Sequence, residues 1–170
     1  MDVLKAIMGR RVQRAFADKP VEPGKLKQIV EAGRHAMSAS NRQPWQFIVI
    51  RKRETLDKLA AHASTGKFLA QAPAAIAILK DKANERWADI DCAQAVQNMA
   101  TAAWSLGLGT CWVGNFEADK ISELLNVPSG WAVFTVLPFG YSDPANPPQD
   151  KPLKPRTENT HFERFGDHQE

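Results

Sequence analysis

The hydrophobic pattern at the start of the chain predicts two helices separated by an extended stretch. Residues 2–8 are expected to form a short helix that Gly9 ends, and residues 10–20 form a basic, extended stretch. A second helix is expected to begin near Pro23, because proline is favoured in a first helical turn. The apolar residues that follow recur at helical spacing on one face: Leu26, Ile29, Val30 and Gly33.

Uninterrupted apolar runs predict the strands. Three long runs and one short one are expected to form strands: 45–50, 74–79, 131–139 and the short 110–113. The run Phe47-Ile48-Val49-Ile50 favours burial of the first strand on both faces. Shorter helical pieces are expected in between: 54–63, 66–72 and 119–125.

The longest helical pattern covers residues 86–106, with no charged residue from Cys92 to Leu106. A helix that is apolar all round is a buried central helix or one face of a dimer. The acidic residues before and within its start have helical spacing, which favours a solvated face: Glu85, Asp89 and Asp91. Beyond Tyr141, five prolines lie within residues 144–155, so this tail is expected to be extended and to dock on another surface.

These elements predict an α+β fold, a mixed α/β sandwich, in one domain over residues 1–170 with residues 143–170 as its extended C-terminal tail. The glycines at 107 and 109 follow a helix and lead into a strand, the reverse of the order in a dinucleotide-binding Rossmann motif. A Rossmann fold is therefore disfavoured.

Composition limits the classes of function. The chain has 170 residues, 44% of them hydrophobic, and a net charge of +3, which is too mild to indicate a nucleic-acid binder. It has no apolar run of membrane-spanning length and no signal peptide at its start, so we expect a cytoplasmic protein without a membrane partner. Cys92 and Cys111 are interpreted as buried thiols, and the four scattered histidines argue against a metal site.

Basic residues gather at both ends of the chain. Arg10, Arg11 and Arg14 lie close together near the start, and Lys154 and Arg156 return in the tail. The planar fork of arginine suits a phosphate group, so the first hypothesis is a phosphorylated small cofactor held by the two ends together. The alternative is a solvated basic patch.

Two further segments are candidates for ligand contact. The loop Ser38-Ala39-Ser40-Asn41-Arg42-Gln43-Pro44 is rich in hydrogen-bonding groups and leads into a buried strand, although it also fits an ordinary connection. Gly114 follows a strand end, where either a close ligand approach or a turn would require glycine. No catalytic triad or carboxylate pair is evident, so an enzyme of this sequence would rely on a cofactor for its chemistry.

In this order and spacing, the segments resemble the nitroreductase family of FMN-dependent oxidoreductases over essentially the whole chain. The resemblance is carried by these motifs: Arg10-Arg11-Val12-Gln13-Arg14-Ala15-Phe16, Ser38-Ala39-Ser40-Asn41-Arg42-Gln43-Pro44-Trp45, Gln97-Asn98-Met99-Ala100-Thr101-Ala102-Ala103, Gly107-Leu108-Gly109-Thr110-Cys111-Trp112 and Leu137-Pro138-Phe139-Gly140-Tyr141. It implies a mostly antiparallel central sheet flanked by helices, in a homodimer whose C-terminal tails are exchanged.

The resemblance also implies roles for residues. Arg10 and Arg11 would contact the FMN phosphate and ribityl chain, with Arg156 and Lys154 closing on the phosphate. Arg14 and Lys67 would place positive charge near flavin N1 and O2, and the backbone of Val113 and Gly114, or of Asn115, would lie near N5 with Gly114 donating to it. The remaining polar candidates would line the ribityl and pyrimidine side: Ser38, Ser40, Asn41, Gln43 and Ser64. Val12 replaces a usual hydroxyl residue, for which Gln13 is a candidate substitute.

The implied function is transfer of hydride from NAD(P)H to FMN and, in a ping-pong scheme, to a small-molecule acceptor such as a nitroaromatic compound or quinone. The short connection of residues 80–87 leaves no lid insertion over the acceptor, and no catalytic side chain is assigned. Two alternatives stay open. One is a non-reductase flavin enzyme of the same fold, of dehalogenase or flavin-fragmenting type, and the other is an FMN-binding module without turnover.

Overall fold

A four-stranded antiparallel sheet forms the centre of the protein. The computed structural model describes residues 2–84, 86–150 and 152–168. The strands follow the order β1-β2-β4-β3 across the sheet. Their bounds are Trp45–Ile50 (β1), Ala74–Asp81 (β2), Gly109–Thr110 (β3) and Trp131–Gly140 (β4). The predicted antiparallel α+β fold is confirmed.

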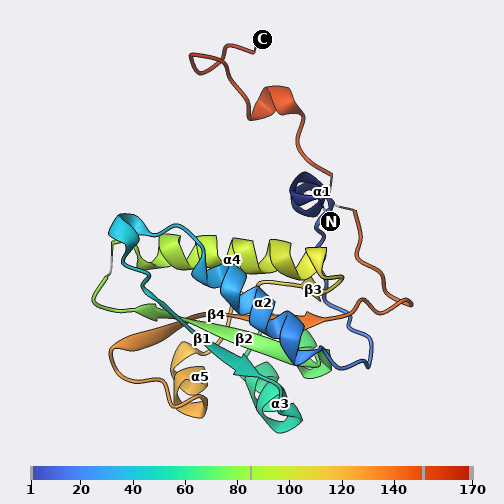
Figure 1. Ribbon diagram of the computed structural model, residues 1–170, viewed down its shortest axis with the longest axis vertical. Coiled ribbons are helices and arrows are strands. Elements are labelled where there is room, and N and C mark those ends of the chain that lie inside the picture. The colour runs from blue at the N-terminus through green and yellow to red at the C-terminus, as the bar shows by residue number, and fades with distance from the viewer. Residues whose placement is uncertain (1, 85, 151, 169–170) are drawn as a thin grey trace.

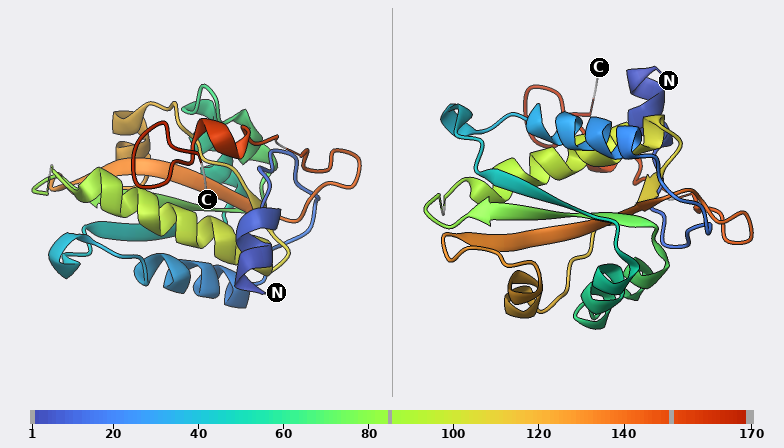
Figure 2. Two further views of the ribbon diagram at one scale, coloured as in Figure 1. Left: turned by 90° about the horizontal axis from the view of Figure 1, so that it is seen from above. Right: turned by 60° about the horizontal axis from the view of Figure 1, so that its bottom comes forward.

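Helices cover both faces of this sheet, as Figures 1 and 2 show. The helices are Val3–Gly9 (α1), Pro23–Arg34 (α2), Arg53–Ala61 (α3), Ala88–Ser105 (α4) and Ala118–Leu124 (α5). The two faces of β2 supply different cores because side chains alternate along a strand. Ile76 and Ile78 pack under α2 and α4, whereas Ala75, Ala77 and Leu79 face α3 and α5.

The strand β1 departs from its prediction. Its bounds are as expected, but its apolar run is not buried on both faces. Val49 remains 45% exposed, and Phe47 and Ile48 are only half-buried. The strand lies at the edge of the sheet, with β2 as its single neighbour, so no described element covers Val49.

The helix α4 is the central helix of one layer. Its buried face packs against α2 and the sheet, while Gln97 and Asn98 are exposed on its other side. A Cβ on Gly33 of α2 would lie 2.8 Å from Met99 Cγ, so glycine is needed where the two helices meet. The charge-free sequence therefore makes a helix with one buried and one exposed side.

Several local expectations need correction. The loop after α2 contains a 3₁₀ turn, Ala39–Asn41 (η1), and the proline-rich tail contains another, Arg156–Glu158 (η3). The expected helix over residues 66–72 is a 3₁₀ helix, Lys67–Gln71 (η2), and the strand expected over residues 110–113 shrinks to β3 plus a single bridge between Val113 and Val136. Glu85 lies outside the described residues.

The acidic residues of α4 were expected to be solvated, and Asp91 contradicts this. Its side chain is 2% exposed, and both of its carboxylate oxygens accept from the Ala39 amide at 3.2 Å. Asp89 is exposed as expected and pairs with Lys80 at 2.5 Å. Spacing along a helix does not reveal that a loop amide, distant in sequence, needs an acceptor on the buried side.

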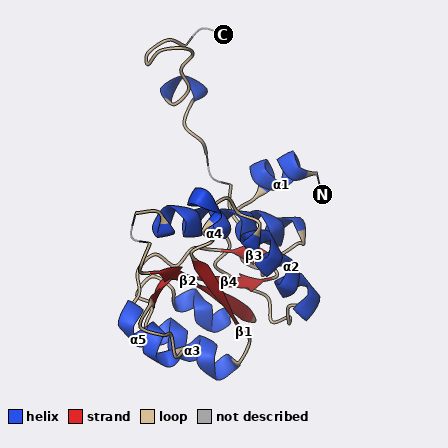
Figure 3. Cartoon of the chain, turned by 60° about the vertical axis from the view of Figure 1, so that its left-hand side comes forward, coloured by secondary structure: helices blue, strands red, loops and turns tan. Residues whose placement is uncertain are grey.

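Beyond Tyr141 the tail first runs along the N-terminal stretch, where Phe16 and Ser142 form a bridge and the Asp143 amide donates to the Ala15 carbonyl at 3.2 Å. Tyr141 itself is tied to α2, because its hydroxyl donates to Glu22 at 2.7 Å and accepts from Lys25 Nζ at 2.8 Å. Lys25 Nζ also donates to the Leu106 carbonyl at 3.0 Å, which joins the ends of α4 and β4. Figure 3 shows the later part of the tail, which contains η3, projecting away from the sheet and the helices that cover it. Leu153 and Phe165 in this part are 91% and 93% exposed.

Candidate functional site

The basic N-terminal stretch is fixed beside β3. Val12 forms a parallel bridge with Thr110, and the Gln13 amide donates to the Thr110 carbonyl at 3.0 Å. Farther on, the Ala17 amide donates to the Tyr141 carbonyl at 3.0 Å. The stretch therefore runs along the end of the sheet as an irregular additional strand. Successive side chains of extended backbone point to opposite sides, which divides its polar residues into two sets.

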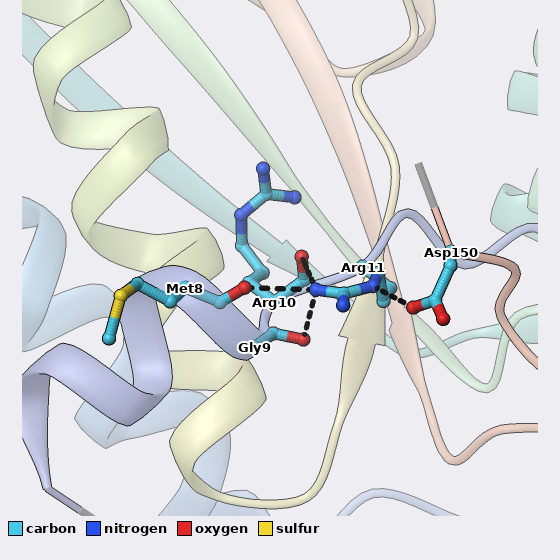
Figure 4. A network of polar contacts seen from close by, with 5 residues as sticks. All are labelled: Met8, Gly9, Arg10, Arg11 and Asp150. Carbon is cyan, nitrogen blue, oxygen red and sulfur yellow. Dashed lines mark hydrogen bonds and ion pairs between the residues drawn. The ribbon is translucent and has the colours of Figure 1, made fainter. Parts of the chain in front are cut away.

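Arg10 and Arg14 form the first set, on the side of Cys111. Burial raises the pKa of the Cys111 thiol, and the positive charges of Arg14 and Arg10 partly offset that rise. Both guanidinium groups therefore lie close enough to this thiol to act on it electrostatically. Arg10 is half-buried, and its Nε has no hydrogen-bond partner among the described residues. Figure 4 shows its guanidinium pointing away from the network around Arg11.

Arg11 and Gln13 form the second set and hold the base of the tail. Arg11 Nε donates to Asp150 Oδ1 at 2.7 Å, and Nη1 donates to the Met8 and Gly9 carbonyls at 2.9 Å, as Figure 4 shows. Gln13 is 1% exposed and donates to the Ala15 carbonyl and, at 3.5 Å, to the Asn146 carbonyl. In this structure Arg11 caps the end of α1, and Gln13 faces the tail.

Gly109 permits this arrangement. A Cβ at Gly109 would lie 2.6 Å from Gln13 Cγ, so only glycine lets β3 approach the buried glutamine. Gln13 Oε1 and Thr110 Oγ1 are buried without hydrogen-bond partners among the described residues. The edge of the sheet thus carries unsatisfied polar atoms at Gln13 and Thr110, and a polar ligand finds partners in such an environment.

A second group of candidates lies farther along the same segment. The Val113 carbonyl accepts from Thr135 Oγ1 at 2.9 Å, which fixes the backbone immediately before Gly114. Ser64 Oγ donates to the Asn115 carbonyl at 3.2 Å. A Cβ on Gly66 would lie 2.7 Å from Val113 Cγ1, so residues 63–67 pack tightly on this segment. Ser64 and Lys67 are exposed beside Val113 and Gly114.

The loop of residues 38–43 is the third group. Ser40, Asn41 and Gln43 adopt positive φ angles of 53°, 54° and 51°. This conformation is unfavourable for residues other than glycine. Ser38 Oγ accepts from the Gln43 amide at 3.0 Å, and Gln43 Nε2 donates to Asn41 Oδ1 at 3.2 Å. Together with Asp91, these bonds hold a strained loop whose polar tips are exposed.

Within one chain, the loop of residues 38–43 and Arg10 lie at opposite ends of α4. The loop is tied to the start of the helix at Asp91, whereas Arg10 lies by β3, which follows the end of the helix. Between Asp91 and Ser105 the helix rises about 21 Å at its usual rise per residue. Figure 1 shows η1 and β3 at opposite ends of α4. The structure therefore places two stretches of chain, one with Arg10 and Arg14 and one with Ser64 and Lys67, against residues 110–115, which include Val113 and Gly114, but leaves the loop apart.

The tail cations are also apart from Arg10. Lys154 Nζ lies 3.9 Å from Glu158, and the Arg156 guanidinium lies 5.9 Å from the Phe162 ring centroid. Both residues belong to the projecting part of the tail in Figure 3. The expected meeting of the two chain ends thus does not occur within one chain. The N-terminal stretch instead contacts the base of the tail, where Arg11 and Gln13 donate hydrogen bonds to Asp150 and Asn146.

Three further features concern metal ligands, cysteines and membrane spans. Within the described part of the chain, no three side chains of metal-ligating type gather in one place. Cys92 and Cys111 are free, buried thiols, as expected. Among the described residues, no helix has both the length and the apolar character to cross a membrane. The sequence missed Asp91, because nothing in its spacing distinguishes it from Asp89.

Comparison with known proteins gives a consistent result. The family model described as the nitroreductase family matches residues 7–67 and 63–141. A Methanothermobacter thermautotrophicus protein named as an NADH dehydrogenase/NAD(P)H nitroreductase is 37% identical over 161 residues, which cover 90% of this chain and 83% of that protein. A Bacillus subtilis protein named FMN reductase [NAD(P)H] is 26% identical, over 96% of this chain and 74% of that protein.

Solved structures agree with these matches. An FMN-dependent nitroreductase from Clostridium difficile superposes with a TM-score of 0.85 at 31% identity, and the match covers 95% of this chain and 99% of that one. NfrA1 from Bacillus megaterium superposes with a TM-score of 0.87 at 26% identity, over 96% of this chain and 74% of that one.

Proposed function

The chain belongs to the nitroreductase family, and on that premise we propose that it is an FMN-dependent oxidoreductase that takes hydride from NAD(P)H. We further propose that it passes the hydride, in a ping-pong scheme, to a nitroaromatic compound, a quinone or a similar acceptor. The names of its relatives support FMN and NAD(P)H as cofactor and electron donor. The observation that carries the proposal is the stretch of residues 110–114. It contacts the Arg10–Arg14 stretch at Thr110 and ends at Gly114.

The residues of that segment fit FMN. Arg10 offers a half-buried guanidinium with an unpartnered Nε, which suits a phosphate. Arg14 and Lys67 are exposed cations. Arg14 lies on the N-terminal stretch, and Lys67 begins η2. In the proposed site they stabilise negative charge on the flavin pyrimidine ring. Arg11 is the weaker phosphate candidate, because its Nε and Nη1 are already satisfied by Asp150 and by carbonyls of α1.

Gly114 fits the position beside flavin N5. A Cβ there would meet no atom closer than 3.9 Å, so this chain's own packing does not require glycine. A flat ligand that approaches the backbone would require it. FMN, when bound, supplies the hydride chemistry, and the Gly114 N–H orients the ring by donating a hydrogen bond. No side chain is assigned as an acid or base.

We propose that the complete site forms in a homodimer. The loop of residues 38–43 and the tail cations Lys154 and Arg156 lie away from Arg10 in one chain, so a second copy would supply them. Helix α1 supports this, because its apolar side chains are exposed: Val3 by 64%, Leu4 by 60%, Ile7 by 51% and Met8 by 69%. A groove of about 600 Å³ between α1, α2 and α4 continues this surface. A second copy that covers it would bury the exposed α1 residues.

The absorbance spectrum of the purified protein, before and after anaerobic NADH or NADPH, tests the function. We expect flavin bands that bleach on addition. Bands that do not bleach would favour the dehalogenase or flavin-fragmenting alternative, and a protein that retains FMN without any turnover would be a binding module.

A double substitution tests the residue assignment. Arg10→Ala with Arg156→Ala is expected to release FMN, since both cations are assigned to the phosphate. The matched control is Lys58→Ala with Lys120→Ala, which removes the same charge from α3 and α5 on the other side of the sheet. Stoichiometric FMN in the Arg10/Arg156 variant would contradict the phosphate assignment.

A further inference from the structure

A second polar pocket lies at the other end of α4 from Arg10. It has a volume of about 510 Å³ and lies between the loop after α2 and the turn that joins β2 to α4. Its lining residues are Arg42, Lys82, Ala83, Asn84, Arg86 and Trp87. None of them is assigned to FMN, although Arg42 stands between Asn41 and Gln43 in the candidate flavin loop.

The three cations of this pocket form no direct ion pair with the described acids around them. Each of these acids has another partner: Asp81 accepts from the Ala83 amide, Asp89 pairs with Lys80, and Asp91 accepts from the Ala39 amide. Within the described residues, no carboxylate lies within ion-pair distance of Arg42, Lys82 or Arg86.

Two further observations point to a ligand. Asn84 is 7% exposed, and its Nδ2 has no hydrogen-bond partner among the described residues. A buried amide without a partner is costly unless something accepts from it. Trp87 is 37% exposed, and the Arg86 guanidinium lies 4.9 Å from its ring centroid, so the ring holds that cation at the pocket. The pocket also adjoins the N-terminus of α4, whose dipole favours an anion.

We propose that this pocket binds a phosphate monoester, and that in the enzyme it takes the 2′-phosphate of NADPH. A phosphate monoester carries close to two negative charges near neutral pH, so it suits three cations better than a single carboxylate does. The assignment rests on the proposed function, in which the adjoining loop lies against the flavin and NAD(P)H must dock on the same flavin. The pocket would then make the enzyme prefer NADPH to NADH.

Steady-state kinetics of the FMN-loaded enzyme test the assignment. Lys82→Ala with Arg86→Ala removes two cations from the pocket, and Lys58→Ala with Lys120→Ala is the control of equal charge on α3 and α5. We expect the pocket variant to raise the KM for NADPH about tenfold, which corresponds to one charge-assisted hydrogen bond, and to leave the KM for NADH and the FMN content unchanged. Equal changes for both nucleotides, no change, or the same change in the control would overturn it.

A binding measurement separates this inference from the proposed function. Calorimetry with 2′-AMP, 5′-AMP and inorganic phosphate on the FMN-loaded protein requires no turnover. We expect 2′-AMP to bind more tightly than the other two, and the Lys82/Arg86 variant to lose this preference. Tighter binding of 5′-AMP, or equal binding of inorganic phosphate, would overturn the 2′-phosphate assignment. A protein that oxidises neither nucleotide yet binds 2′-AMP in this pocket would contradict the proposed function and keep the phosphate site.

Discussion

Removing the Asp91 carboxylate should weaken FMN binding, although Asp91 is not placed against the cofactor. Asp91 is 2% exposed and accepts from the Ala39 amide through both oxygens at 3.2 Å. That amide begins the loop in which Ser40, Asn41 and Gln43 hold positive φ angles. Each such residue costs about 1 kcal/mol or more, so the loop keeps its shape only where other bonds hold it.

The expected size of the effect follows from that hydrogen bond. Asp91→Ala leaves the Ala39 amide without its acceptor, which costs about 1–3 kcal/mol in a partly buried position. If the loop contributes to the flavin site, this energy is subtracted from FMN binding, and the Kd for FMN rises roughly 5- to 150-fold. Asp91→Asn keeps a carbonyl oxygen as an acceptor and should recover most of the affinity.

Quenching of flavin fluorescence on titration of the apoprotein measures these affinities. The control is Asp89→Ala, which removes the same charge from the same helical turn but breaks only an exposed ion pair with Lys80. An exposed pair contributes little, so this variant should bind FMN like the parent. If Asp91→Ala and Asp89→Ala bind FMN equally well, the loop is not held by Asp91 or does not contact the flavin. If Asp91→Asn is as weak as Asp91→Ala, the role is not that of an acceptor.

Three other substitutions or conditions test the framework around the site. Tyr141→Phe removes the hydroxyl that joins Glu22 to Lys25 and should lower Tm by about 2–4 °C in a thermal melt. Gly109→Ala would place a Cβ against buried Gln13 and should destabilise the protein by about 1–3 kcal/mol in urea denaturation, whereas Gly24→Ala, whose Cβ meets nothing within 4 Å, should not. Burial raises the pKa of the Cys92 thiol to about 12, so stability from the neutral thiol is intact below its ordinary 9.0 and is lost as the pH rises toward 12. Cys92→Ala should flatten this alkaline fall in denaturation midpoints, and an unchanged slope would contradict the assignment.

The secondary structure was largely predictable because its signals are local. The strands β1, β2 and β4 begin where apolar runs begin, and α2 begins at the proline that its sequence marked. The burial of β1 was not predictable in the same way. Its apolar run resembles that of β2, and only the strand order places β2 inside the sheet and β1 at its edge, with Val49 exposed.

The arrangement of the candidate site residues could not be predicted from the sequence. Sequence order suggested that Arg10 and Arg11 act together, yet the extended backbone sends Arg10 toward Cys111 and Arg11 toward Asp150. Gln13 was a candidate replacement for a missing hydroxyl, and its burial against the base of the tail could not be read from its position in the sequence. These outcomes depend on tertiary contacts between residues far apart in sequence, which no local spacing contains.

The proposed division of the site between two chains would link cofactor binding to dimerisation. If Arg10 and Gly114 of one chain meet the loop and tail cations of another, a monomer offers FMN only part of its contacts. Because such coupling is reciprocal and the dimer has two equivalent sites, FMN must then strengthen the dimer by the square of the factor by which dimerisation strengthens FMN binding at each site. Sedimentation equilibrium with and without FMN measures the first factor, and flavin titrations above and below the dimer Kd measure the second. We expect the binding factor to exceed about tenfold and the dimerisation factor to equal its square, since several charge-assisted contacts to the phosphate depend on the partner. An FMN affinity that does not change on dilution into monomer would show that one chain holds the whole site, and the loop and tail would then lose their proposed roles.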